Sequence, residues 1–132
     1  MSVAVRAFTA VPAPTQTVAA LCTACVVLTA APSPGRITAW HPPGGPGIRV
    51  DSHAYANYFV PPNYDSMIGK VIAYGDTREQ ALRRMRIALS EMAVEGILTN
   101  IQLHRELLAD ARFIAGGTSI HYLENKLAGQ PG

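Results

Sequence analysis

A run of apolar residues at 67–74 is followed at once by a helix-start signal, and this pair of features limits the possible folds more than any other. The run has the branched and aromatic content of a strand in the middle of a sheet. Gly69 within it indicates a bulge or the close approach of another backbone. A capping box at 76–79, in which Asp76 accepts from the Glu79 amide, predicts that a helix starts directly afterwards.

The predicted helix carries one apolar stripe, whose members recur three and four residues apart as on a buried helix face. The stripe consists of Ala81, Leu82, Met85, Ala88, Leu89 and Met92. We therefore assign its methionines to the core and not to a cofactor site. Gly96 is predicted to be the C-terminal stop of this helix.

Two short strands are predicted before this run, at 36–40 and 48–53, with the rigid loop 41–47 between them. A hairpin is plausible there. On the second strand, alternation places Arg49, Asp51 and His53 on one face.

The C-terminal part of the chain reads as helical. Asn100 can cap a second helix, and Gly116 and Gly117 separate it from a last short one. Because strands come first and helices last, the sequence predicts an α+β fold, an antiparallel sheet with helices packed on it.

The 132 residues suit one globular domain, which we place at 32–132. Residues 1–31 are dominated by Ala, Val, Thr and Pro, and their only charge is Arg6. They show no sustained period, so we expect them to be disordered. Residues 18–31 imitate a signal-peptide core but are too short to span a membrane, and a secreted protein is a distant alternative to a cytoplasmic one.

Charge and cysteine content exclude some functions. The net charge is +2 without a basic block, which argues against nucleic-acid binding. Arg83, Arg84 and Arg86 read as a solvated helix face. Cys22 and Cys25 form a lone C-x-x-C, a weak signal for metal or redox chemistry.

Most other reactive side chains lack a productive arrangement. Asp51, Ser52 and His53 have the residue types of a hydrolase triad, but neighbours on a strand point to opposite faces. Glu91 and Glu95 read as solvated charges four apart on a helix. No metal site is predicted, because no convergent spacing links the four histidines His41, His53, His104 and His121.

Arg49 is the strongest candidate for a binding residue. It follows a rigid loop and lies on a strand, where its planar guanidinium could hold a carbonyl or carboxylate oxygen. From spacing alone, an ordinary salt bridge with Asp51 is the competing interpretation.

Several motifs in fixed order resemble the C-terminal domain of biotin carboxylases over residues 32–127. The longest, PPNYDSMIGK at 61–70, is highly specific. The others are PSPGRI at 32–37, PGGPGIRVDSH at 43–53, Arg84-Met85 with Ala88-Leu89, EGI at 95–97 with Thr99-Asn100, and GGT at 116–118 with YLE at 122–124.

The resemblance implies a parent reaction in which ATP, bicarbonate and magnesium are used to carboxylate biotin on a carrier protein. It implies a catalytic role for Arg49, beside the ureido ring of biotin. It also implies a homodimer, with a biotin carboxyl carrier protein and a carboxyltransferase as partners, in the first half-reaction of acetyl-CoA or another acyl-CoA carboxylase and thus in fatty acid biosynthesis.

The departures from the family pattern limit what the chain alone can do. The family's ATP, magnesium and bicarbonate residues precede the matched region, so no ATP-binding or metal residue is placed in this chain. Residues 1–31 also lack the charged strand that usually leads into PSPG. We expect an inactive fragment of a stand-alone carboxylase subunit, because the chain ends soon after Leu127, without a fused biotinyl domain. The alternative is a non-catalytic interaction module, or split subunit, that docks on an intact carboxylase.

Overall fold

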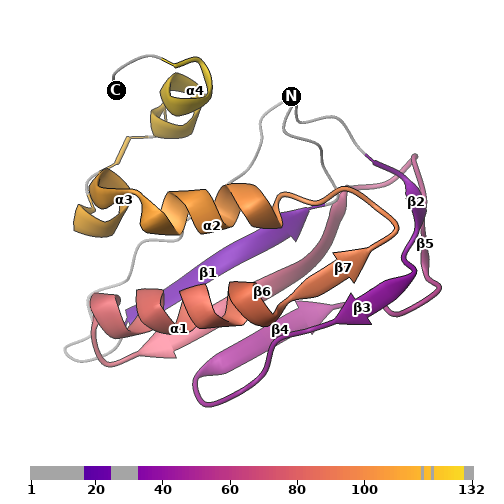
Figure 1. The fold of residues 1–132 in the computed structure, drawn as a ribbon, viewed down its shortest axis with the longest axis horizontal. Coiled ribbons are helices and arrows are strands. Elements are labelled where there is room, and N and C mark those ends of the chain that lie inside the picture. Colours follow the sequence, from indigo (N-terminus) through magenta and orange to yellow (C-terminus); the bar gives the residue numbers. More distant parts are fainter. Residues whose placement is uncertain (1–16, 25–32, 117, 120, 130–132) are drawn as a thin grey trace.

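The computed structural model describes residues 17–24, 33–116, 118, 119 and 121–129. The order of elements in these residues is β1 (Thr17–Ala24), β2 (Gly35–Arg36), β3 (Ala39–His41), β4 (Ile48–Ser52), β5 (Phe59–Val60), β6 (Met67–Gly75), α1 (Arg78–Glu91), β7 (Ala93–Glu95), α2 (Ile101–Ala109), α3 (Ala111–Ala115) and α4 (Tyr122–Leu127). Helices α1 and α2 lie side by side over the strands (Figure 1). None of the described helices has the length and hydropathy needed to cross a membrane.

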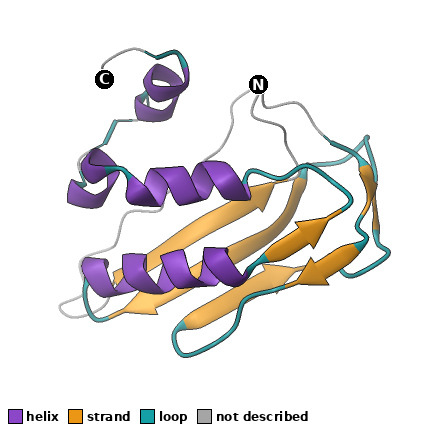
Figure 2. Ribbon diagram, viewed as in Figure 1, coloured by secondary structure: helices purple, strands orange, loops and turns teal. Residues whose placement is uncertain are grey.

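The main sheet has β6 at its centre, with β1 and β4 antiparallel on its two sides. Two smaller antiparallel pairs, β2 with β5 and β3 with β7, extend the strand layer (Figure 2). The predicted α+β fold, an antiparallel sheet with helices packed on it, is therefore confirmed. The central place predicted for the strand at 67–74 is also confirmed.

The possible hairpin between residues 36–40 and 48–53 does not form. β3 pairs with β7, whereas β4 pairs with β6. The connecting loop turns at Gly45 and Gly47, whose φ angles of 111° and 77° lie in the left-handed region. The Gly47 carbonyl then accepts from the Tyr74 amide at 2.7 Å. This bond ties the end of the loop to β6, so β4 runs along β6 and not along β3.

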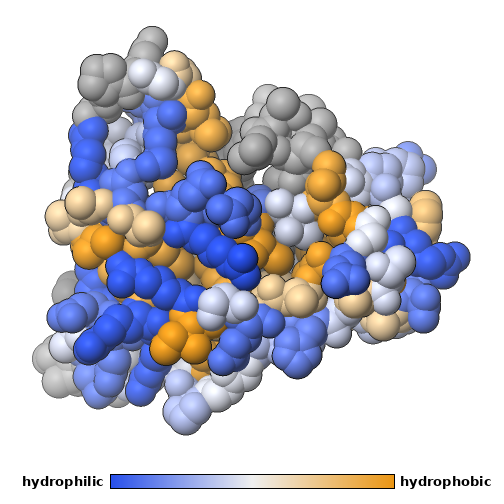
Figure 3. All heavy atoms as spheres, viewed as in Figure 1, coloured by the Kyte–Doolittle hydropathy of each residue, from blue (hydrophilic) through white to orange (hydrophobic). Residues whose placement is uncertain are grey.

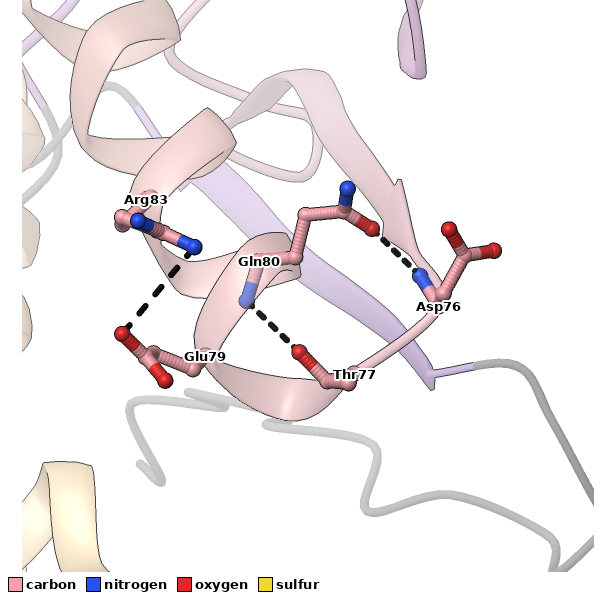
Figure 4. A network of polar contacts seen from close by, with 5 residues as sticks. All are labelled: Asp76, Thr77, Glu79, Gln80 and Arg83. Atoms are coloured by element: carbon pink, nitrogen blue, oxygen red, sulfur yellow. Dashed lines mark hydrogen bonds and ion pairs between the residues drawn. The ribbon is translucent and has the colours of Figure 1, made fainter.

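The start of α1 lies one residue later than the predicted capping box. Thr77 is the N-cap, and its hydroxyl accepts from the Gln80 amide at 3.2 Å. The Gln80 side chain accepts in turn from the Asp76 amide at 2.6 Å, while Glu79 points to Arg83 (Figure 4). The reciprocal bonds form one residue further along because Thr77 and Gln80 have the same spacing as Asp76 and Glu79.

The core lies between the main sheet and α1. The predicted stripe is buried, and Met85 and Met92 are only 0% and 4% exposed, so their assignment to the core is confirmed. The main apolar cluster comprises Val71, Ala73, Leu82, Met85, Ala88, Leu89, Met92, Ile101, Leu108 and Phe113. A smaller cluster of Ile37, Val60 and Ile68 joins the β2–β5 pair to β6.

The prediction that Arg83, Arg84 and Arg86 form a solvated face is wrong for Arg84, which is half-buried. Arg84 donates to the Tyr74 carbonyl at 2.5 Å, and Arg86 donates twice to a carbonyl of α2. Arg83 and Arg86 are both exposed, and Arg83 lies 4.0 Å from Glu79. The sequence pattern misled because backbone carbonyls of other elements lie within reach only after folding.

Arginines also brace α1 and α2 against each other. Arg86 of α1 donates to the Leu108 carbonyl near the end of α2, at 3.0 and 2.8 Å. Arg105 of α2 donates to the Leu89 carbonyl near the end of α1, at 3.0 Å from its Nε. Each helix therefore supplies donors for a carbonyl in the last turn of the other, where helices leave acceptors unpaired.

Part of the segment at 1–31 is a strand, where the sequence led us to expect disorder. β1 runs from Thr17 opposite Gly75 to Ala24 opposite Met67, with a register shift between Thr23 and Ala24. Backbone pairing with a neighbouring strand can impose β structure on a sequence without a clear period. Residues 1–16 and 25–31 lie outside the described residues, and for them disorder stays a prediction.

Candidate functional site

The two faces of β4 are chemically opposite. Ile48 and Val50 pack on the main core, and Arg49 and Asp51 alternate with them. Arg49 Nη2 donates to Asp51 Oδ2 at 2.9 Å. The two side chains are 70% and 48% exposed. The sheet therefore presents a guanidinium at its surface, on the side away from α1.

Strand register brings residues of β6 to the same side. Ile72 lies opposite Arg49, and Lys70 lies opposite Asp51. Residues directly opposite on antiparallel strands share a face. Tyr74 follows two positions after Ile72 and shares that face as well. We name Arg49, Asp51, Lys70, Ile72 and Tyr74 the open face.

Lys70 is the residue of the open face that sequence reasoning missed. Its position within a buried-looking strand gives it no distinguishing pattern, yet it is exposed. The signal that places it beside Asp51 is the pairing of β4 with β6. That pairing could not be derived from spacing, because the sequence suggested that the strand at 48–53 pairs with the one at 36–40.

A groove of about 240 Å³ adjoins the open face. It is lined by Asp51, Ser52, His53, Met67, Gly69 and Lys70. A Cβ at Gly69 would lie 3.3 Å from the Ser52 side chain, closer than most such contacts. The nearest backbone atom, the Asp51 carbonyl oxygen, would lie at 3.6 Å, which is an ordinary contact, so the predicted close approach of another backbone is not what distinguishes Gly69. The register of β6 with β1 shifts beside Gly69, which agrees with the alternative prediction of a bulge.

The structure agrees with the rejection of a hydrolase triad. Ser52 Oγ donates to the Ile68 carbonyl at 2.5 Å and accepts from the Ala54 amide at 2.9 Å. His53 packs edge-on against Tyr58, with ring centroids 5.3 Å apart. The Ser52 proton is committed to a backbone carbonyl, so His53 does not activate this hydroxyl.

The remaining histidines are dispersed. His41 is exposed at the end of β3, and His104 is fully buried in α2. His121 is exposed, with Nδ1 3.0 Å from Glu124. In the part of the chain that the structure describes, no three His, Cys, Asp or Glu side chains gather as metal ligands would.

The two glutamates predicted on one helix face lie on different elements. Glu91 ends α1, and Glu95 lies on β7. The helix stops between them, earlier than the stop predicted at Gly96, because Met92 adopts an extended backbone with ψ of 122° and β7 begins at Ala93. Of the two cysteines, Cys22 lies in β1 at the register position opposite Lys70, and Cys25 lies outside the described residues.

An ion pair near the C-terminus was not predicted. Asp110 ends α2 and caps α3, accepting from the Arg112 amide at 2.8 Å, and it also pairs with Lys126 of α4. Lys126, and after it Tyr122, hold the pKa of Asp110 well below its usual range. The same pair raises the pKa of Lys126, and burial raises the pKa of Tyr122. This contact fastens α4 to the α2–α3 junction.

Comparisons with known proteins place this fold among biotin-dependent carboxylases. The biotin carboxylase of Pseudomonas aeruginosa is 60% identical over 96 residues, which are 73% of this chain and 21% of that protein. The solved biotin carboxylase of Campylobacter jejuni, described as a complex with beta-gamma-ATP, has a TM-score of 0.81 and 33% sequence identity to this chain. The similarity covers 88% of this chain and 27% of that one. The biotin carboxylase domain of Hydrogenobacter thermophilus 2-oxoglutarate carboxylase, a dimer with MgADP, ADP and bicarbonate, has a TM-score of 0.80 and 34% sequence identity to this chain. The similarity covers 82% of this chain and 24% of that one.

A match to a family model over most of the chain identifies its family. The sequence model described as "Biotin carboxylase C-terminal domain" matches residues 25–125, and the chain belongs to that family. The chain spans about a fifth of the length of the curated relative from P. aeruginosa.

Proposed function

We propose that this domain serves the carboxylation of biotin and contributes Arg49 as its catalytic residue. The observation that carries the proposal is the position of Arg49, on a strand whose other face is locked in the core. The guanidinium is exposed and is oriented by Asp51 at 2.9 Å. A cation held in this way is ready for a ligand that approaches the open face.

The carboxylation of biotin would be assisted by such a cation. When a ureido nitrogen of biotin loses its proton to accept a carboxyl group, negative charge develops on the ureido oxygen. A fixed guanidinium beside that oxygen stabilises the transition state more than the ground state. Asp51 orients the planar fork of Arg49 without covering it, since most of the Arg49 side chain is exposed.

The ATP-dependent part of the reaction belongs, in this proposal, to another part of the carboxylase. The match covers only 21% of the P. aeruginosa relative. We propose that ATP, magnesium and bicarbonate bind in the remainder, so that this chain is inactive alone. We also propose that the carboxylase is a homodimer with a biotin carboxyl carrier protein and a carboxyltransferase as partners. Its substrate would be an acyl-CoA such as acetyl-CoA, and it would act in fatty acid biosynthesis in the cytoplasm. The dimeric H. thermophilus neighbour supports the homodimer.

A second candidate function is a split subunit that docks on a carboxylase without supplying catalysis. The exposed charges of the open face favour it, because they would suit a contact surface as well as a substrate site.

A chimera tests the proposed function. Residues 33–127 of this chain would replace the matching region of the P. aeruginosa biotin carboxylase. We expect the chimera to carboxylate free biotin when ATP and bicarbonate are supplied, and this chain alone to show no bicarbonate-dependent ATP hydrolysis. A folded chimera without biotin carboxylation would contradict the proposal. Turnover by the isolated chain would contradict the division of labour.

A further inference from the structure

We propose that Arg84 is a positioning residue, which holds the loop 41–47 and, through this loop, Arg49. Arg84 lies on α1, and the Arg49 guanidinium lies on the side of the sheet away from α1, so Arg84 acts through the backbone that leads into β4. The inference deepens the proposed function and rests on it for the role of Arg49. The place of the loop can be measured without that function, so the two can fail separately.

Arg84 binds the backbone at the point where the loop meets β6. Its Nη1 donates to the Tyr74 carbonyl at 2.5 Å. The Tyr74 amide donates in turn to the Gly47 carbonyl at 2.7 Å. One residue of β6 therefore joins α1 to the end of the loop, two residues before Arg49.

Gly47 is packed directly against this contact. Its φ angle of 77° lies in the region that favours glycine. A Cβ at this position would lie 2.6 Å from Arg84 Nη1 and 2.8 Å from the Tyr74 carbonyl oxygen, both closer than real Cβ atoms come. A Cβ at Gly44, earlier in the same loop, would meet nothing within 4 Å. The guanidinium is thus fitted to the end of the loop that adjoins β4.

The bond between Tyr74 and Gly47 continues the register of β4 with β6. In that register Ile48 lies opposite Ala73, and Arg49 lies opposite Ile72. A shift by one residue would turn every side chain of β4 to the other face, which would take Arg49 away from the surface. Because Arg84 anchors Tyr74, it helps to keep Arg49 in place.

The other arginines of α1 bind elsewhere and supply controls. Charged and polar residues cover much of this helix (Figure 3). Arg83 and Arg86 are exposed, whereas Arg84 is half-buried. Arg86 donates to the Leu108 carbonyl of α2 at 3.0 and 2.8 Å. A change at Arg86 therefore removes an arginine and its hydrogen bonds from α1 without touching the loop contact.

Hydrogen exchange in the isolated chain tests the contact itself. Arg84→Ala should speed exchange of the Tyr74 amide by about tenfold or more relative to the Leu89 amide of α1, because one hydrogen bond that anchors Tyr74 is lost. Arg86→Ala should leave this ratio unchanged. Arg84→Lys should restore most of the protection, since one donor is enough for the Tyr74 carbonyl. An unchanged ratio in Arg84→Ala would overturn the proposal.

A pair of glycine variants tests the contact from the loop side. Gly47→Ala places a Cβ against Arg84 and the Tyr74 carbonyl, so it should also speed exchange of the Tyr74 amide relative to the Leu89 amide. Gly44→Ala, the matched control, should not. Since Gly47→Ala keeps Arg84, it also serves if Arg84→Ala does not fold. An unchanged ratio in Gly47→Ala would overturn the proposal.

Rate measurements in the chimera test the consequence for Arg49. Arg84→Ala should lower kcat for biotin carboxylation by about tenfold to a hundredfold, as a displaced catalytic group does, and leave KM for ATP unchanged. In an Arg49→Ala background the same change should have no further effect, because the residue that Arg84 positions is gone. Arg86→Ala should leave the rate unchanged in both backgrounds. Equal losses from Arg84→Ala in both backgrounds would overturn the positioning role.

The two kinds of measurement separate this inference from the proposed function. Faster Tyr74 exchange in Arg84→Ala, together with a normal rate for Arg49→Ala, would reject the proposed function and keep the contact between Arg84 and the loop. A lowered rate for Arg49→Ala, together with unchanged Tyr74 exchange in Arg84→Ala, would keep the proposed function and reject the positioning role.

Discussion

Successive residues of β4 and β6 point alternately to two faces of the main sheet, and the two faces have different roles. On one face Val50 and Val71 pack under α1. On the other, Arg49 and Lys70 reach solvent. The period of two along each strand separates the part that holds the fold from the part that can do chemistry. Substitutions on one face should therefore change stability, and those on the other should change function.

The largest stability effect is expected on the core side of this comparison. Leu89 of α1 is fully buried, so Leu89→Ala should lower the free energy of unfolding by about 2–5 kcal/mol, through lost burial and the cavity left behind. Ile87, 59% exposed on the same helix, is the matched control, and Ile87→Ala should change it by no more than about 0.5 kcal/mol. Urea unfolding followed by circular dichroism measures both. Equal losses of unfolding free energy in the two variants would contradict the distinction between the buried and exposed sides of α1.

The next largest loss of stability is expected when an arginine hydrogen bond between α1 and α2 is removed. Arg105→Ala removes the donors to the Leu89 carbonyl, and hydrogen bonds from charged groups contribute about 1.5–3 kcal/mol. Arg83→Ala removes only an exposed pair with Glu79 and should cost less than about 0.5 kcal/mol. The same unfolding experiment compares them. If the two variants lose the same stability, the brace between α1 and α2 does not contribute as proposed.

A smaller effect, dependent on pH, is expected from Asp110. Its pKa is lower in the folded chain than the ordinary value of 3.8. The stabilisation is therefore fully present above 3.8 and is lost as the pH falls through the folded pKa. Asp110→Asn keeps an N-cap side chain but removes the charge. The melting temperature of the variant should lie below that of the unchanged chain near neutral pH, and the gap should close in acid. A gap that persists unchanged in strong acid would contradict this assignment.

The smallest stability effect is expected on the open face. Asp51→Asn breaks an ion pair whose members are 48% and 70% exposed, and such pairs contribute less than about 1 kcal/mol. In the chimera the same variant should lower the carboxylation rate, because Asp51 orients Arg49. A marked loss of stability with an unchanged rate would show that the pair is structural.

The sequence predicted local features well and distant pairings poorly. The strand at 67–74 and the stripe of α1 were found because period and burial are properties of one segment. The possible hairpin from 36–40 to 48–53 was wrong, since β3 meets β7 more than fifty residues further along the chain. Lys70 and the arginine donors to Tyr74, Leu89 and Leu108 were missed for the same reason. Their partners are defined only by tertiary contact.

The measurement that tests the account most directly is made on Arg49→Ala in the chimera, with rate and stability determined on the same variant. The carboxylation rate should fall about a hundredfold or more, equivalent to about 2.7–4 kcal/mol, as when an oxyanion donor is removed. The free energy of unfolding should change by less than about 1 kcal/mol, and ATP affinity should stay the same. Arg49→Lys should restore little of the rate, because an ammonium lacks the planar fork. A normal rate with lowered stability would contradict the account and remove Arg49 from the site.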